Sequence, residues 1–236
     1  MKTKNSPSNP SLMNNPVISK NKIQKIKEFF TEKNTILLLI AMHIAGIIGL
    51  ALPEIQSFFK LLVPFNLITN ALLILFFQKQ WNKYLIVALV ITMFVGFGIE
   101  VLGVHTGAIF GNYWYKTTLG YKVLEVPILI AINWLIVIYT TSSCVAEIKI
   151  PKGLKALLAT FLTVGLDFFI EPIAIKLNFW DWQNGIIPLQ NYVGWFVTAL
   201  ILHLIFVFLP FEKKNKVAIV LYFCELVFFL VLGLIL

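Results

Sequence analysis

The chain has 236 residues, of which 59% are hydrophobic, and its mean hydropathy is +0.87. Ordinary soluble domains contain roughly 45 to 50% apolar residues, so this composition excludes that class and predicts a membrane protein. All 19 basic residues are lysines and the net charge is +8. We attribute this charge to membrane topology and to attraction to anionic lipid headgroups, and not to nucleic-acid binding.

The N-terminal segment is polar and rich in Asn, Ser, Pro and Lys, which predicts a disordered basic tail over residues 1–34. Within it, the stretch from Lys20 to Phe30 places Ile and Phe at helical spacing. This pattern indicates either a helix lying on the cytoplasmic surface or a basic flank of the first span. No short apolar stretch with a cleavage site lies in this segment, so no removable signal peptide is expected.

Residues 35–236 are predicted to form one transmembrane domain with seven apolar runs. Each run approaches the roughly 20 residues that an α-helix needs to cross a bilayer. The runs are 35–52, 61–77, 84–101, 124–146, 154–175, 191–209 and 216–236. The predicted fold class is therefore all-α, a polytopic bundle of about seven transmembrane helices.

The lysines are distributed unequally between the connections. Fifteen lie before the first span or in alternate connections at residues 79–83, 149–155 and 213–216, and four lie elsewhere. Because lysine-rich connections stay in the cytoplasm, this distribution predicts a cytoplasmic N-terminus and a C-terminus outside. The two long connections, residues 102–123 and 176–190, would then lie outside a bacterial or archaeal cytoplasmic membrane.

Cys144 and Cys224 lie in separate predicted spans, without a Cys-x-x-Cys motif or a Cys/His spacing. Neither a zinc site nor a redox pair is indicated. We therefore expect no metal site.

Several polar residues occur singly within predicted spans. His43 and His203 have no carboxylate or second histidine at ligand spacing, and we interpret both as residues that hydrogen-bond neighbouring helices. Glu225, Asn66 and Asn70 either make packing contacts or line a more remote part of a common cavity.

Other polar residues converge on the outer half of the predicted membrane. They are Glu100, His105, Glu125, Asn133, Asp167, Glu171, Asp181 and Asn191. A single wet pocket accounts for this convergence, although Glu125 and Asp181 flank spans and are typical of solvated residues. His105 fits a loop hydrogen-bonding residue as well as a proton carrier.

Asp167 and Glu171 are four residues apart, so a helix places them on one face. Two carboxyls this close in a low-dielectric site resist simultaneous ionisation, so one should keep a proton and act as an acid beside an anion. With aromatic faces that stabilise a cation, such a pair suits protonation of an electron-rich alkene in a lipid, followed by water capture. A purely structural pair and proton-coupled transport are the alternatives.

Two stretches, Glu100 to Trp134 and Leu166 to Trp195, carry a series of motifs. In order, these are Glu-(x)2-Gly-(x)2-Thr-Gly, Tyr-x-Tyr, Val-Pro, Trp-x-Trp, Pro-Leu-x-Asn and Gly-Trp. On these motifs the chain resembles the integral-membrane carotenoid biosynthesis proteins of the hydratase type, which include bisanhydrobacterioruberin hydratase and gamma-carotene hydratase. Two positions depart from the family pattern, because Ile109 stands where proline is usual and Glu171 stands where aspartate is commoner.

The resemblance implies cofactor-independent addition of water to the terminal double bond of an acyclic carotenoid end, giving a tertiary alcohol. In our hypothesis Asp167 or Glu171 donates the proton and the other stabilises the cation or activates water. Glu100 and His105 would form a second acid/base pair or position that water. The residues expected to bind the substrate are Thr106, Tyr113, Tyr115, Asn133, Trp134, Trp180, Trp182, Asn191 and Trp195. The implied partners are the carotenoid, water, the lipid bilayer and other carotenoid-synthesis enzymes.

Three other classes of membrane protein are alternatives to this hypothesis. A seven-helix retinal protein needs a Schiff-base lysine, which the interior of the last span lacks. A proton-coupled transporter favours acidic residues through both halves of the membrane and often two similar halves, and neither is evident. A non-catalytic scaffold of a carotenoid-synthesis complex would tolerate neutral replacements of Asp167 and Glu171.

Overall fold

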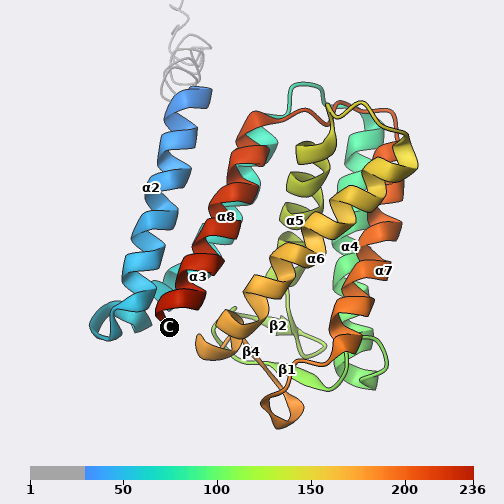
Figure 1. Ribbon diagram of the computed structural model, residues 1–236. Coiled ribbons are helices and arrows are strands. Elements are labelled where there is room, and N and C mark those ends of the chain that lie inside the picture. Colours follow the sequence, from blue (N-terminus) through green and yellow to red (C-terminus); the bar gives the residue numbers. More distant parts are fainter. Residues whose placement is uncertain (1–29) are drawn as a thin grey trace, which may run out of the picture.

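The computed structural model describes residues 30–236, which form seven α-helices (Figure 1). They are α2 (Glu32–Ala51), α3 (Pro53–Phe76), α4 (Lys83–Thr106), α5 (Leu129–Val145), α6 (Lys152–Lys176), α7 (Leu189–Phe208) and α8 (Lys216–Ile235). Six of them are long and apolar enough to cross a membrane. The predicted helical bundle is confirmed, whereas the predicted surface helix and most of the predicted basic tail lie outside the described residues.

Helix α5 is the central helix of the bundle and is shorter than the others, with 17 residues. At 1.5 Å per residue it extends about 26 Å, slightly less than the roughly 30 Å hydrocarbon core. It begins at Leu129 because the residues before it form a turn, in which Leu124 and Glu125 have φ angles of 48° and 63°. The predicted span from residue 124 was therefore too long at its start, although nearly all of α5 is buried as expected for a central helix.

Helices α2 and α3 are joined by a single residue, Leu52, in an extended conformation. The next residue is Pro53, and a proline disfavours helical geometry in the residue before it. The proline thus ends α2 and occupies the first position of α3, where its missing N–H costs nothing. Helix α3 starts earlier than the predicted residue 61 because its first turns carry polar residues such as Glu54 and Lys60.

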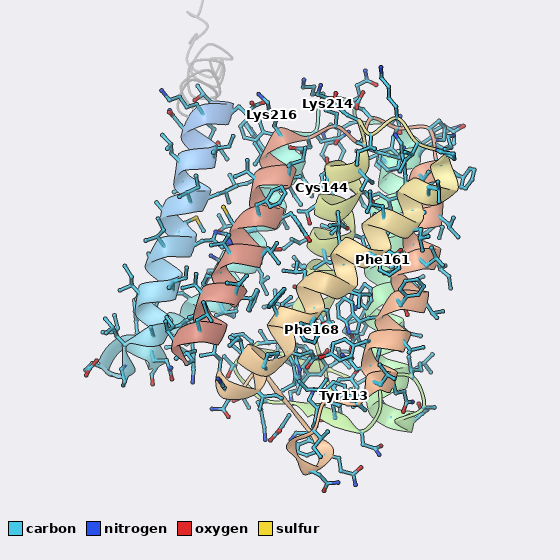
Figure 2. The ribbon with its side chains drawn as sticks, in the orientation of Figure 1. Tyr113, Cys144, Phe161, Phe168, Lys214 and Lys216 are labelled. Atoms are coloured by element: carbon cyan, nitrogen blue, oxygen red, sulfur yellow. The ribbon has the colours of Figure 1, made fainter. Side chains whose placement is uncertain are left out.

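The connections between helices fall into two groups at opposite ends of the bundle (Figure 1). The connections 77–82, 146–151 and 209–215 lie at one end, here called the lysine end. The long connections 107–128 and 177–188 lie at the other, here called the strand end. Figure 2 shows Lys214 and Lys216 at the lysine end and Tyr113 at the strand end. We continue to predict that the lysine end faces the cytoplasm.

The two long connections are joined to each other by a short antiparallel sheet. Strand β1 (Tyr113–Tyr115) pairs with β4 (Trp180–Trp182), with Tyr113 opposite Trp182 and Tyr115 opposite Trp180. A second small sheet pairs β2 (Lys122–Val123) with β3 (Val126–Pro127). Successive side chains of a strand point to opposite faces, so Tyr113, Tyr115, Trp180 and Trp182 share one face.

The other face of the β1–β4 sheet carries Trp114 and Asp181. Lys116 forms an ion pair with Asp181 at 3.4 Å and lies 5.3 Å from the centre of the Trp114 ring. The charged and amphipathic groups of the two strands therefore lie away from the face that carries the four aromatic residues. The sheet closes the strand end with an aromatic layer.

The outside of the bundle is covered by large apolar side chains. Phe94, Phe161 and Phe168 are 79%, 57% and 58% exposed, and Figure 2 shows the last two projecting from α6. Extensive exposed apolar surface is typical of a membrane-facing protein and rare on soluble monomers. The buried polar residues are thereby confined to the interior of the bundle.

Candidate active site

The carboxyl pair predicted from the sequence lies on one face of α6, and both side chains are 2% exposed. Asn191, near the start of α7, connects them. Its Nδ2 donates to Oδ2 of Asp167 at 3.2 Å and to Oε1 of Glu171 at 3.0 Å. One amide group therefore fixes α7 against α6 at this level and holds the two carboxyls together.

Glu171 receives two further hydrogen bonds from the first sheet. The indole Nε1 groups of Trp180 and Trp182 donate to its Oε2 at 2.9 and 2.8 Å. The two-residue spacing of the tryptophans places both indoles on the inner face of β4, which explains how neighbouring residues reach the same oxygen. Glu171 thus accepts hydrogen bonds from three side chains.

A third buried carboxyl, Glu100 on α4, is 3% exposed and also has three donors. Tyr113 and Tyr115 donate to its Oε2 at 2.5 and 2.8 Å, and the indole of Trp134 donates to Oε1 at 3.1 Å. Gly96, one turn before Glu100, allows this indole to approach, because a Cβ there would lie 2.4 Å from Cγ of Trp134. The tyrosines thus pair with Glu100 as the tryptophans of the opposite strand pair with Glu171.

The two tyrosines are permanent donors at neutral pH. Burial raises the pKa of Tyr113 and of Tyr115 above the ordinary value of 10.0, and the negative charge of Glu100 raises both further. A group whose neutral form is favoured in this way keeps its proton well above the pH at which an exposed phenol loses it. Both hydroxyls are therefore available to stabilise an anionic Glu100.

The three carboxyls differ in the number of side chains that donate to them. Glu100 and Glu171 each accept from three side chains, whereas Asp167 accepts from Asn191 alone within the described residues. Hydrogen bonds to a carboxylate favour its charged form, and burial without them favours the neutral form. Asp167 therefore has the fewest hydrogen bonds to stabilise an anion, and Glu100 and Glu171 have more.

A small cavity of about 20 Å³ lies between Glu100 and Glu171. Phe110, Tyr113, Tyr115, Ile130, Asn133, Trp180, Trp182, Asn191 and Trp195 complete its lining. A cavity needs about 10 to 15 Å³ to hold one water molecule, and that water needs polar partners, which this lining supplies. The site can therefore hold a single water between two carboxylates.

Most of the residues predicted to form the site are brought together. Trp195 stacks on Trp134 with the ring centroids 4.0 Å apart and the planes 12° from parallel, so the indole that holds Glu100 is itself fixed by α7. Asn133, one residue before Trp134, lines the cavity. The predicted convergence of polar groups on one half of the bundle therefore agrees with the positions of these side chains.

Two predicted site residues lie apart from this cluster. His105 and Thr106 are exposed at the end of α4. The side chain of His105 hydrogen-bonds the carbonyl of Val101, and Thr106 donates to the carbonyl of Leu102 and accepts from the N–H of Ala108. His105 does not lie beside Glu100, because five residues correspond to about 140° around a helix and the two side chains point in different directions. Both residues instead contribute to the end of the helix.

The structure also adds a residue that the sequence did not single out. Phe110 is 1% exposed, lines the cavity and contacts Tyr113 edge-on at 6.1 Å between ring centroids. Added Cβ atoms at Gly103 and Gly194 would lie 2.6 and 2.7 Å from this ring. The glycines were the available signal, since an aromatic ring needs such gaps to lie between two helices.

A separate polar cluster lies in the bundle interior around His203, which is fully buried on α7. Its Nδ1 lies 2.9 Å from the Ser142 hydroxyl, and its Nε2 lies 3.0 and 3.3 Å from those of Thr163 and Thr141. These contacts join α5, α6 and α7, which confirms the interpretation of His203 as a helix–helix hydrogen-bonding residue. Among the described residues no group of three or more His, Cys, Asp and Glu side chains is arranged to hold a metal ion.

Comparison with known proteins identifies the family of the chain. The sequence model of a family described as carotenoid biosynthesis protein matches residues 37–236. Bisanhydrobacterioruberin hydratase from Haloarcula japonica is 31% identical over 134 residues, which are 51% of this chain and 44% of that relative. The alignment thus spans less than half of the relative, and no solved structure matches the chain. Because the family model covers most of its length, the chain belongs to the carotenoid biosynthesis protein family.

Proposed function

We propose that the protein is a hydratase that adds water across the terminal double bond of an acyclic carotenoid end and produces a tertiary alcohol. Family membership supports a function in carotenoid modification, and the Haloarcula relative carries the name of a hydratase. The observation that carries the proposal is a cavity for one water between two buried carboxyls, Glu100 and Glu171, with a third, Asp167, joined to Glu171 through Asn191. Hydration of an alkene requires an acid, a base and a water molecule.

The first step is proton transfer from Asp167 to the less substituted carbon of the terminal alkene. A new C–H bond forms from the alkene electron pair, and a tertiary carbocation remains on the more substituted carbon. The anionic Glu171 and the faces of Trp180 and Trp182 stabilise this positive charge. Asp167 lies one helical turn from Glu171 on α6, and Asn191 hydrogen-bonds both carboxyls, so the proposed acid adjoins the carboxyl that lines the cavity.

The second step is capture of the cation by water. The oxygen of the cavity water forms the C–O bond, and the proton it releases passes to Glu100, whose charge Tyr113 and Tyr115 stabilise. Return of this proton to Asp167, through water that enters after the product has left, restores the starting state, so no proton is consumed beyond those of the added water. The reaction requires no redox equivalent.

The proposal is tested by expressing the chain in a bacterium that accumulates lycopene or gamma-carotene and analysing the pigments by mass spectrometry. We expect a pigment that is heavier by one water, and we expect it to disappear in the Asp167→Asn variant. Asp181→Asn is the matched control, because Asp181 also lies near the site but forms a partly exposed ion pair on the outer face of the sheet. Unchanged pigments in cells with folded, inserted protein would favour the transporter and scaffold alternatives.

A further inference from the structure

A larger cavity lies at the lysine end, at the opposite end of the bundle from the carboxyl cluster (Figure 1). Its volume is about 530 Å³, and it is lined by residues of α5, α6 and α7 and of the connections between helices. Gln80 and Pro210 line it and are exposed, so it opens to the surface. The buried Ser142 also lines it, so it extends into the bundle. We call this cavity the lysine pocket.

Three lysines from two parts of the chain line this pocket. Lys152 and Lys155 lie at the start of α6, and Lys213 lies in the connection before α8. In the part of the chain that the structure describes, none of the three forms an ion pair. The next lysine, Lys214, does not line the pocket and pairs with Glu147 at 2.5 Å. The lysines of this end are therefore of two kinds, and those of the pocket have no acidic partner among the described residues.

Carbonyl oxygens of the pocket wall hold two of these ammonium groups in place. Nζ of Lys155 donates to the carbonyl of Ala146 at 2.6 Å. Nζ of Lys213 donates to the carbonyls of Leu209 and Phe211 at 2.8 and 2.9 Å. All three acceptors belong to residues that line the pocket. Because an ammonium group has three N–H donors, Lys155 keeps two of them and Lys213 keeps one for a ligand.

The charges that line the pocket do not cancel. Glu212 is its one acidic lining residue, and Oε1 of this carboxylate accepts from the backbone N–H of Lys214. Three lysines and one glutamate leave a positive excess. Burial, together with the positive charges of Lys152 and Lys155, lowers the pKa of the Lys213 ammonium to about 8, although the charge of Glu212 opposes this effect. Because a partly buried cation is stabilised by a nearby anion, the pocket suits an anionic ligand.

We propose that the lysine pocket binds an anionic phosphate group, carried either by a membrane phospholipid or by a soluble phosphate compound. Phosphate oxygens accept charge-assisted hydrogen bonds from ammonium groups, and basic pockets between transmembrane helices bind anionic headgroups. The start of α6 adds further N–H groups beside the lysines, because Pro151 provides no side-chain cap and the first turn of a helix attracts anions. Nζ of Lys152 lies 5.4 Å from the centre of the Phe208 ring, which is 61% exposed on the outside of the bundle. One edge of the pocket therefore adjoins the apolar outer surface, where a phospholipid could enter.

The first arm of the test offers a phospholipid. The delipidated protein in an uncharged detergent is titrated with phosphatidylglycerol or with phosphatidylcholine, and native mass spectrometry measures the bound lipid. We expect phosphatidylglycerol to bind more tightly. The double variant Lys152→Gln/Lys213→Gln should weaken its binding by about tenfold or more, because a hydrogen bond to a charged group corresponds to roughly 10- to 100-fold in affinity. Lys149→Gln/Lys214→Gln is the matched control, since it removes the same charge from neighbouring positions outside the pocket, and it should change the affinity less than about twofold.

The second arm offers a soluble phosphate compound. Pyrophosphate is titrated into the same delipidated protein in an isothermal calorimeter. Binding tighter than about 1 mM that is lost in Lys152→Gln/Lys213→Gln and kept in the control would assign a soluble ligand to the pocket. Binding of phosphatidylglycerol with this dependence, and no binding of pyrophosphate, would assign a phospholipid headgroup.

The inference is overturned if neither probe binds the unmodified protein, or if the two double variants bind alike. Lys152→Gln alone keeps the test decisive if the double variant does not fold, because this exposed amine makes no hydrogen bond in the described part of the chain. Its loss of affinity should be smaller and should still exceed that of Lys149→Gln. Both arms measure binding without turnover, so their outcome is independent of the proposed hydratase function.

Discussion

The carboxyl cluster and the His203 cluster are both polar and buried inside the bundle, yet they are built differently. Around His203, three hydroxyls on neighbouring helices contact a ring that needs no charge. Around Glu100, Asp167 and Glu171, the hydrogen-bond donors are shared unequally, and a cavity remains. Burial of a polar group in a membrane protein is therefore weak evidence for a catalytic role. Buried carboxyls with unequal numbers of hydrogen-bond donors beside a cavity for one water are stronger evidence.

Among the tests of this comparison, we expect the largest loss of hydration rate for Asp167→Asn. The amide cannot supply a proton, and loss of a general acid lowers a rate by about 10²- to 10⁴-fold. The measurement is the rate of pigment hydration in membranes with matched amounts of inserted protein. A rate within twofold of the unmodified protein would assign Asp167 to the same structural role as His203.

The next effect concerns the donors on Glu171. Replacing Trp182 by Phe keeps an aromatic face and removes one of the two indole N–H groups on Oε2. A hydrogen bond to a charged group contributes about 1.5 to 3 kcal/mol, so we expect a rate roughly 10- to 100-fold lower. Trp114→Phe is the matched control, because Trp114 lies on the outer face of the same sheet and contacts no carboxyl of the cluster. Equal rates in the two variants would show that the indole N–H does not assist the reaction.

The His203 cluster should respond in stability and not in rate. His203→Leu leaves the hydroxyls of Ser142 and Thr163 without their shared partner, at a cost of about 0.6 to 2 kcal/mol inside a membrane protein. Equilibrium unfolding in mixed detergent micelles measures this loss, and pigment hydration per folded molecule should stay within twofold. A large loss of rate with unchanged stability would mean that His203 takes part in the reaction.

The smallest effect is spectroscopic. Because the pKa of Tyr113 and of Tyr115 lies above 10.0, both phenols should remain neutral at pH 10, where exposed tyrosines are half ionised. The folded protein should therefore show the same ultraviolet phenolate absorbance at pH 10 as its Tyr113→Phe variant. A smaller phenolate signal in the variant would mean that Tyr113 ionises there and that its contact with Glu100 is weaker than the structure indicates.

The helices could be predicted because a span needs a long apolar run, and the α6 carboxyl pair could be predicted because four residues complete about one turn. The β1–β4 pairing escaped prediction, since it joins two strands of only three residues each, in connections that are distant in sequence. The Tyr-x-Tyr and Trp-x-Trp spacings carried the period of a strand, and that period now explains why four aromatic donors share one face. Depth in the membrane placed His105 with Glu100, but depth does not determine the direction of a side chain around the helix, and His105 is exposed.

The pairing of β1 with β4 has a consequence for how the protein is made. Glu100 and its tyrosines are synthesised well before Glu171 and its tryptophans, and the two halves meet only when β4 has left the ribosome and paired with β1. Glu100 has all three of its donors, Tyr113, Tyr115 and Trp134, in the chain before α6 is made. Glu171, in contrast, gains its two indole donors only when β4 follows α6 and folds back against it.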